Sequence, residues 1–251
     1  FRPSFGASPV QLAGREFEIS SFNYGLVGGV GSMQRALLVS GTRGVGKTVL
    51  LNEFEESARR LGWVVIRAYA DAQMVAQLRD STIPEAIEEL DYTEKTGRKI
   101  TGFSVAGVGS VTTQLPHNQA QPSLVSRLRS LLKAARAHDA GVLLTVDEVQ
   151  AASVDELAQL ATAIQDLIRD EYDIAFAAAG LTFGVEELLE HEGTTFLRRA
   201  QRLDLGLLDD ATVAETLQST ATAAGRGFSE RALKEATALV QGYPYLLQLV
   251  G

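Results

Sequence analysis

The sequence predicts an α/β fold in which a mainly parallel sheet lies between two layers of helices, followed by a small helical domain. Short apolar segments alternate with helical segments through the first four fifths of the chain. The apolar segments are continuously hydrophobic, which is typical of strands buried on both faces of a parallel sheet. After Leu208 only helices separated by turns are expected. We therefore predict a core domain over residues 1–206 and a helical domain over residues 207–251.

The expected strands are short, and each is followed by a helical or turn segment. They cover residues 36–39, 63–70, 141–148 and 173–180, with a last short strand near 202–205. Helices are expected at 15–23, 47–60, 72–95, 123–137 and 154–169, with Leu50, Phe54, Ala58 and Leu61 on one face of the second. Residues 1–14 are predicted to form an extended arm, 25–33 a flexible glycine-rich loop, and 101–113 a hairpin at an edge of the sheet or against a partner.

Capping residues support the predicted C-terminal helices. Asp209 or Asp210 is expected to cap the first, and Ser229 the second. Gly242 is suited to end the second helix, and Pro244 to occupy the first turn of the third. The chain begins without methionine and stops inside a helical pattern, so we expect a longer protein with a truncated helical domain here.

The overall composition excludes several classes of protein. The formal net charge is -8, which argues against broad nucleic-acid binding by this segment. The chain has no cysteine, so disulfides, thiolate zinc sites and a cysteine nucleophile are excluded. It has neither an apolar run of about 18 residues nor a signal-peptide pattern, so no membrane span and a cytoplasmic location are expected.

The segment GTRGVGKT, residues 41–48, fits the pattern G-x-x-x-x-G-K-[ST] at every fixed position. It follows a predicted strand and opens a predicted helix, which is the context that this phosphate-binding loop, or P-loop, requires. Lys47 is expected to reach the β- and γ-phosphates of ATP, or the β-phosphate of ADP, and the Thr48 hydroxyl to coordinate Mg²⁺. The nucleotide-binding residues predicted here are Thr42, Arg43, Gly44, Val45, Gly46, Lys47, Thr48 and Val49.

A pair of acidic residues ends the predicted strand VLLTVDE. Asp147 is expected to hold Mg²⁺ through water, and Glu148 to activate the attacking water as general base. Two solvated carboxylates at a strand end are the alternative. Their position downstream of a P-loop favours the catalytic interpretation.

With these motifs the sequence resembles the AAA+ ATPases, in the branch that includes origin-recognition-type initiators and STAND signalling ATPases. It looks particularly like bacterial and archaeal AAA-type ATP-binding proteins. The segment LAGRE, residues 12–16, resembles the box that precedes the P-loop in this family and borders the adenine. The resemblance therefore implies Leu12, Ala13, Gly14 and Arg15 as neighbours of the base.

Two further motifs follow from the same resemblance. FLRRA, residues 196–200, implies that Arg198 or Arg199 reaches the γ-phosphate of a neighbouring subunit. GYP, residues 242–244, resembles the lid motif of STAND proteins and implies that Tyr243 and Pro244 lie against the nucleotide. The chain departs from the family in having no arginine in this lid motif. The strand AFAAAG also lacks a polar sensor at its tip, where Thr182 is the nearest hydroxyl.

The expected function is hydrolysis of Mg-ATP to ADP and phosphate, driving a conformational or assembly change. A nucleotide-gated switch or scaffold with negligible turnover is the first alternative. The second is a DNA-associated ATPase with a winged helix beyond Gly251. The expected partners are the nucleotide, further copies of the chain and an unidentified protein.

Overall fold

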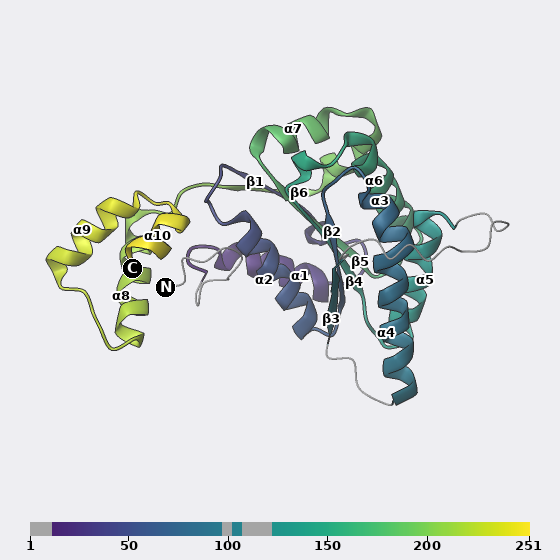
Figure 1. Cartoon of the computed structure of the whole chain (residues 1–251), viewed down its shortest axis with the longest axis horizontal. Helices are drawn as coiled ribbons and strands as arrows, with labels where there is room; N and C mark the ends of the chain where they lie inside the picture. The colour runs from purple at the N-terminus through teal and green to yellow at the C-terminus, as the bar shows by residue number, and fades with distance from the viewer. Residues whose placement is uncertain (1–11, 97–101, 107–121) are drawn as a thin grey trace.

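A six-stranded sheet forms the centre of the molecule in the computed structural model, which describes residues 12–96, 102–106 and 122–251 (Figure 1). Within these residues the strand order is β3-β2-β4-β5-β1-β6, and every pair is parallel. The α/β fold predicted from the sequence is therefore confirmed. The strands are β1 Ala36–Gly41, β2 Val64–Tyr69, β3 Phe103–Ala106, β4 Val142–Asp147, β5 Ile174–Gly180 and β6 Gln201–Leu205.

Helices cover both faces of this sheet (Figure 1). One face packs against α1 Glu16–Val27 and α2 Lys47–Arg60. The other packs against α3 Met74–Gln77, the π-helical turn η2 Leu78–Thr82, α4 Ile83–Thr96, α5 Leu124–Arg136, α6 Val154–Arg169 and α7 Thr182–Glu190. The short 3-10 segments are η1 Met33–Arg35, η3 Val149–Ala151 and η4 Glu192–Arg199. In the described part of the chain, no helix has the length and apolar character of a membrane span.

The two hydrophobic cores explain why the strands are apolar at almost every position. On β4, Val142 and Leu144 face the core beneath α4–α6, whereas Leu143 between them faces the core beneath α1 and α2. Successive side chains of a strand point to opposite faces, so both sets are buried here. The carboxyl ends of β1, β4 and β5 meet at one edge of the sheet, which is where ligands bind in open parallel sheets.

Three helices follow the sheet and share a hydrophobic cluster of their own, which includes Val213, Leu217 and Val240. They are α8 Asp210–Ala223, α9 Glu230–Val240 and α10 Pro244–Val250, grouped to one side of the sheet (Figure 1). The side chains of Asp209 and Ser229 accept hydrogen bonds at the starts of α8 and α9, and Pro244 opens α10, as predicted. The Thr212 hydrogen bonds hold the pKa of Asp209 below its usual value.

Two local predictions were wrong. Helix α1 continues to Val27, so the first residues of the predicted glycine-rich loop are helical. The absence of a side chain at Gly25 lets this part of the helix pack against Gln34, because a β-carbon on Gly25 would lie 2.6 Å from the β-carbon of Gln34. The second wrong prediction placed Leu61 on the same face of α2 as Phe54 and Ala58. Leu61 is instead 46% exposed, because α2 ends at Arg60 before the chain turns.

Other predictions are confirmed or fall outside the described residues. β3 pairs with β2 as an edge strand, as one interpretation of residues 101–113 proposed. Residues 107–113 of the predicted hairpin lie outside the described residues, as do residues 1–11 of the predicted arm.

A buried arginine attaches α1 to the sheet. Arg35 is 4% exposed, and its guanidinium donates to the carbonyl oxygens of Gly25 and Leu26, both at 2.8 Å. The same group donates to the Asp173 carboxylate at 2.8 Å and lies 5.0 Å from the ring centroid of Trp63. It therefore satisfies two carbonyls near the C-terminus of α1 and fixes this helix beside β1 and β5.

Replacing this arginine by a residue of similar length tests its role in folding. We expect Arg35→Met to lower the free energy of unfolding by about 2–4 kcal/mol, because it leaves buried carbonyls without a donor. Urea denaturation followed by circular dichroism measures the change. Arg231→Met is the control, because Arg231 is an exposed residue paired with Glu235, and it should change stability by less than about 0.5 kcal/mol. Equal losses in the two variants would contradict the anchoring role.

Candidate nucleotide-binding site

The P-loop connects the end of β1 to the start of α2. Gly44 and Gly46 have φ values of +81° and +95°, in the left-handed region that favours glycine. Gly46 is the N-cap of α2, and no side chain caps this helix. The first backbone N–H groups of α2 are therefore available to an anion, and the helix dipole favours a phosphate there.

Lys47 is buried at the start of α2 and folds back over the loop. Its ammonium donates hydrogen bonds to the carbonyl oxygens of Gly41 at 3.1 Å and Thr42 at 2.9 Å. Burial lowers the pKa of this ammonium, and the nearby carboxylates of Glu148 and Asp147 oppose that shift. No ion pair involving Lys47 occurs within the described residues. The loop thus holds a partly desolvated cation that a phosphate would stabilise.

The rest of the predicted P-loop set has graded exposure. Val45 is 2% exposed and packs into the core beneath α1 and α2, so it anchors the loop. Val49 is half-buried on α2, whereas the side chains of Thr42 and Arg43 are exposed. The loop is therefore anchored to the core by Val45, and its Thr42 and Arg43 side chains remain accessible to solvent.

Thr48 and Asp147 meet at the predicted metal position. The Thr48 hydroxyl donates to the Asp147 carboxylate at 2.6 Å, which joins the first turn of α2 to the end of β4. These residues are 99 positions apart in the chain. An oxygen-only pair of hydroxyl and carboxylate suits Mg²⁺, which takes its remaining ligands from water and phosphate oxygens. The donor set therefore fits the predicted ion.

Glu148 follows in a left-handed turn, with φ 53° and ψ 47°. Its backbone N–H donates to the Asp147 carboxylate at 2.8 Å, and its side chain is exposed. A left-handed conformation is uncommon for a residue other than glycine and costs of order 1 kcal/mol, and such residues cluster at functional sites. The Glu148 carboxylate accepts a hydrogen bond from the side-chain amide of Gln150, a residue that sequence analysis missed.

A cavity of about 400 Å³ lies beside this position. Thr48, Asp147 and Glu148 line one part of it, and Glu55 and Arg67 line another. Sequence analysis did not identify Glu55 or Arg67 as part of the site. The signal was available, because Glu55 lies three residues before Ala58 and therefore next to the apolar face that the sequence predicts for α2.

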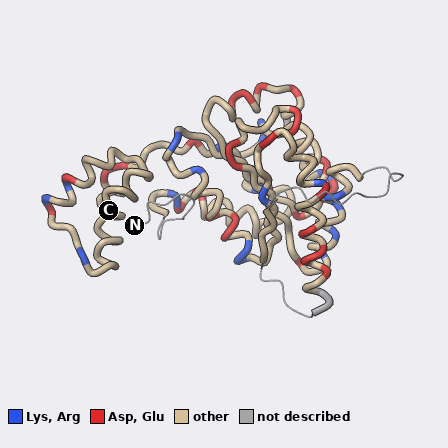
Figure 2. Tube along the Cα trace, in the orientation of Figure 1, with Lys and Arg blue, Asp and Glu red and all other residues tan. Residues whose placement is uncertain are grey.

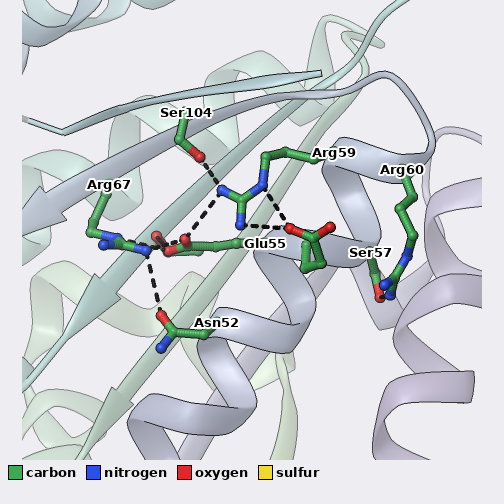
Figure 3. Close-up of polar contacts among 9 residues, drawn as sticks. Asn52, Glu55, Ser57, Arg59, Arg60, Arg67 and Ser104 are labelled. Atoms are coloured by element: carbon green, nitrogen blue, oxygen red, sulfur yellow. Dashed lines mark hydrogen bonds and ion pairs between the residues drawn. The ribbon is translucent and has the colours of Figure 1, made fainter. Parts of the chain in front are cut away.

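Glu55 is buried at the centre of a polar cluster (Figure 3). Its carboxylate accepts hydrogen bonds from Arg67 on β2 and, at 2.8 Å, from the Thr145 hydroxyl on β4. Arg59, one turn later on α2, forms an ion pair with it at 3.7 Å. These contacts fix α2 against β2 and β4, so they support the Thr48–Asp147 contact from behind.

The segment predicted to border the base lies at the junction between the sheet and the C-terminal helices. The Arg15 guanidinium donates to the carbonyl oxygen of Gly206 at 2.7 Å. Gly14 has φ +66°, and a β-carbon there would lie 3.1 Å from a methyl group of Leu208. Leu12 and Ala13 are half-buried beside them. Gly14 and Arg15 therefore contact the segment that follows β6.

The GYP motif lies close to the P-loop through the residue that follows it. Gly242 has φ +73°, and its carbonyl oxygen accepts a hydrogen bond from the Leu208 N–H at 2.8 Å. Tyr243 and Pro244 are half-buried at the start of α10. The Tyr245 N–H then donates to the Gly44 carbonyl oxygen at 3.3 Å, a contact that sequence analysis missed. The helical unit α8–α10 therefore contacts the P-loop directly.

Comparison with known proteins agrees with this architecture. The family model described as AAA ATPase domain matches residues 11–175. The chain belongs to the AAA ATPase family. The predicted membership is thus confirmed. A search of curated proteins gave no match.

Solved structures share the fold of this AAA ATPase at low sequence identity. A Walker-type ATPase of Pyrococcus abyssi has a TM-score of 0.64 and 17% identity, covering 99% of this chain and 70% of that protein. The ORC2 protein of Aeropyrum pernix, in ADPNP–ADP complexes, has a TM-score of 0.59 and 16% identity, with coverage of 99% and 63%. The ORC1 protein of Aeropyrum pernix, in complex with DNA, has a TM-score of 0.52 and 18% identity, with coverage of 96% and 59%. The chain thus spans 59% to 70% of these proteins.

The two arginines predicted as candidate fingers of this AAA ATPase differ in their contacts. Arg198 donates to the carbonyl oxygens of Leu189 at 2.7 Å and Glu190 at 3.3 Å, so it caps the C-terminus of α7. Arg199 is exposed and makes no hydrogen bond or ion pair with the described part of the chain. Neither arginine contacts the P-loop or the acidic pair of its own chain.

Removing the P-loop cation tests the site. We expect Lys47→Ala to weaken ATP binding about a hundredfold, because two charge-assisted hydrogen bonds to phosphate are worth roughly 3 kcal/mol together. Isothermal titration calorimetry with ATP measures the affinity. Lys133→Ala, on the exposed side of α5, is the matched control and should bind ATP normally. Equal affinity in the Lys47 variant and the control would remove Lys47 from the phosphate site.

Proposed function

We propose that the chain binds Mg-ATP between the P-loop and the helical unit α8–α10, and hydrolyses it to ADP and phosphate. The observation that carries this proposal is the 2.6 Å contact between Thr48 and Asp147. It brings together the two expected metal ligands. Lys47 directly precedes Thr48 in the chain, and Glu148 directly follows Asp147. The ADPNP–ADP complexes of the similar Aeropyrum pernix ORC2 structure support nucleotide as the ligand.

Each side chain has a defined task in this reaction. Lys47 and the first N–H groups of α2 bind the β- and γ-phosphates and neutralise charge on them. Glu148 accepts a proton from the attacking water, whose oxygen bonds to the γ-phosphorus. The bond from that phosphorus to the bridging oxygen breaks, and ADP leaves. Bound through Thr48 and Asp147, Mg²⁺ would supply charge stabilisation to the β- and γ-oxygens.

The helical unit α8–α10 provides a route from the reaction to a conformational or assembly change. It contacts the P-loop through Tyr245 and Gly44, and it meets the end of the sheet through the Gly242–Leu208 hydrogen bond. Arg15 holds the segment between them through Gly206. We propose that exchange of ATP for ADP changes these contacts, because the nucleotide binds where they converge.

A nucleotide-gated switch with negligible turnover is the second candidate. Two observations favour it. The end of β5 carries Ala178, Ala179 and Gly180, without the polar side chain that the family resemblance implies there. Arg198 is engaged in capping α7. In this case nucleotide would close the helical unit over the P-loop, and the output would be binding of a partner protein.

Direct contact of this segment with DNA is not favoured. Acidic residues gather over α7 and η4 (Figure 2), where Glu186, Glu187, Glu190 and Glu192 are all exposed. Phosphate backbones are repelled by such a surface. If a longer form of this protein contacts DNA as the ORC1 structure of Aeropyrum pernix does, we assign that contact to a part of the protein other than the described residues.

Removing the carboxylate at position 148 distinguishes the two candidates. If the chain hydrolyses ATP, Glu148→Gln should lower kcat by about 100-fold or more, because a positioned base contributes that much. ATP affinity should change by less than about twofold. Phosphate release measures turnover, and Glu187→Gln on exposed α7 is the control. Wild-type release no higher than that of the Glu148 variant, with nucleotide still bound, would favour the switch.

Mixing experiments test whether an arginine acts on a neighbouring subunit. We propose Arg199 for this role, because Arg198 is engaged by α7. Specific activity should rise with protein concentration, and Arg199→Ala should abolish that rise without changing ATP affinity. Mixing the Arg199 variant with Glu148→Gln should restore part of the activity, since some interfaces then carry both groups. Arg231→Ala on α9 is the control, and failure to restore activity at any ratio would contradict action across an interface.

A further inference from the structure

Gln150 links the proposed general base to the end of β5. Its side-chain nitrogen donates a hydrogen bond to the Glu148 carboxylate. Its side-chain oxygen accepts a hydrogen bond from the Leu181 N–H at 3.0 Å, directly after β5 and before α7. A carboxylate can only accept and a backbone N–H can only donate, so the two partners fix the orientation of the amide. Gln150 therefore connects the turn after β4 with the tip of β5.

Two glycines make room for this side chain. A β-carbon on Gly180 would lie 2.5 Å from a methyl group of Val149 and 2.9 Å from the Gln150 side-chain oxygen. A β-carbon on Gly184, in the first turn of α7, would lie 2.5 Å from the β-carbon of Gln150. Neither glycine has a positive φ, so the requirement is for space rather than for backbone conformation. Gln150 thus lies in a slot formed by β5 and α7.

The contact restricts a carboxylate that is otherwise free to move. Glu148 is exposed, and its side chain makes no other hydrogen bond or ion pair within the described residues. A charge-assisted hydrogen bond holds one carboxylate oxygen and leaves the other available to a water molecule. A general base must be held within hydrogen-bond reach of the proton that it removes, and small displacements reduce the rate strongly.

We infer that Gln150 is a positioning residue for Glu148, and that it supplies the polar function that is absent from the Ala178–Gly180 end of β5. This inference rests on the proposed hydrolysis of ATP. The amide holds the Glu148 carboxylate near the carboxyl end of β5. The position of this carboxylate therefore depends on the position of the start of α7. A glutamine is suited to this role because it is neutral and carries a donor and an acceptor at the same distance from the backbone.

Two substitutions of similar size separate positioning from packing. Gln150→Met fills the slot but cannot bind either partner, and we expect it to lower kcat about tenfold through loss of alignment. Gln150→Glu keeps the acceptor for Leu181 but places a second carboxylate beside Glu148. Its kcat should be lowest at high pH and rise toward the wild-type value as the pH falls, because the introduced carboxyl group, once protonated, can donate to Glu148 as the amide does.

The matched readouts exclude a general structural effect. KM and ATP affinity should stay within about twofold of wild type in both variants, since the phosphate site is unchanged. The ratio of Gln150→Met to wild-type kcat should be independent of pH. Gln159→Met, on the exposed side of α6, should leave kcat and KM unchanged.

A measurement without turnover shows whether the contact forms in solution. In a nitrogen-15 spectrum of the deuterated protein, the Gln150 side-chain amide is identified by its loss in Gln150→Met. We expect Glu148→Ala to shift this amide signal, whereas Glu187→Ala should not. An unshifted amide would overturn the proposed contact.

The outcomes separate this inference from the proposed function. Glu148-dependent hydrolysis with a normal kcat in Gln150→Met would overturn the inference and leave the ATPase intact. A parallel loss of kcat and ATP affinity, with no recovery of Gln150→Glu at low pH, would reduce Gln150 to a structural role. A third outcome is that Glu148→Ala shifts the Gln150 amide signal but the wild-type protein shows no turnover. That result would overturn both the ATPase and the positioning role, and only the contact would remain.

Discussion

The buried carboxylate of Glu55 is the interaction on which the geometry of the site depends. It lies on α2, the helix that begins with the P-loop lysine, and accepts hydrogen bonds from side chains on β2 and β4. A buried charge is costly unless it is paired and hydrogen-bonded, so this arrangement tolerates little displacement of the three elements. Because α2 and β4 are fixed relative to each other, the Thr48 hydroxyl meets the Asp147 carboxylate at the edge of the sheet.

The same edge of the sheet is bounded by backbone contacts to the helical unit α8–α10. Gly242 and Leu208 join the end of α9 to the segment after β6, and Tyr245 joins α10 to the P-loop. A side chain at Gly242 would collide with the Leu208 carbonyl oxygen, so the close approach depends on glycine. Because these contacts converge beside the P-loop, a ligand bound there can change them.

Gln150 and Arg198 show where the chain departs from a simple family pattern. Each lies near a residue with an expected catalytic role, Gln150 near Glu148 and Arg198 next to Arg199. The side chains of both make their contacts within the same subunit. Gln150 contacts Glu148 and the Leu181 N–H, directly before the N-terminus of α7. Arg198 donates to carbonyl oxygens at the C-terminus of the same helix. Helix α7 is therefore held at both ends by groups that neighbour Glu148 and Arg199. Its position is a physical link between the two parts of the proposed catalytic machinery.

The sequence by itself determined the features that depend on local order along the chain. Continuous apolar strands predicted the parallel sheet, and the glycine, lysine and threonine of residues 41–48 predicted the loop at the start of α2. Capping at Asp209 and Ser229 was predictable for the same reason, because a cap and its helix are adjacent. The extent of α1 was not, because Gly25 is accommodated by a contact with Gln34 rather than by propensity.

Only the tertiary structure decided which distant residues meet. The pairing of Glu55 with Arg67 and Thr145, the anchoring of α1 by Arg35, and the approach of Tyr245 to Gly44 join separate elements of the fold. Neighbouring arginines 198 and 199 look equivalent in sequence but differ in contacts, because only one reaches the end of α7. Such contacts depend on packing and on the directions in which side chains leave their elements, which no local pattern encodes.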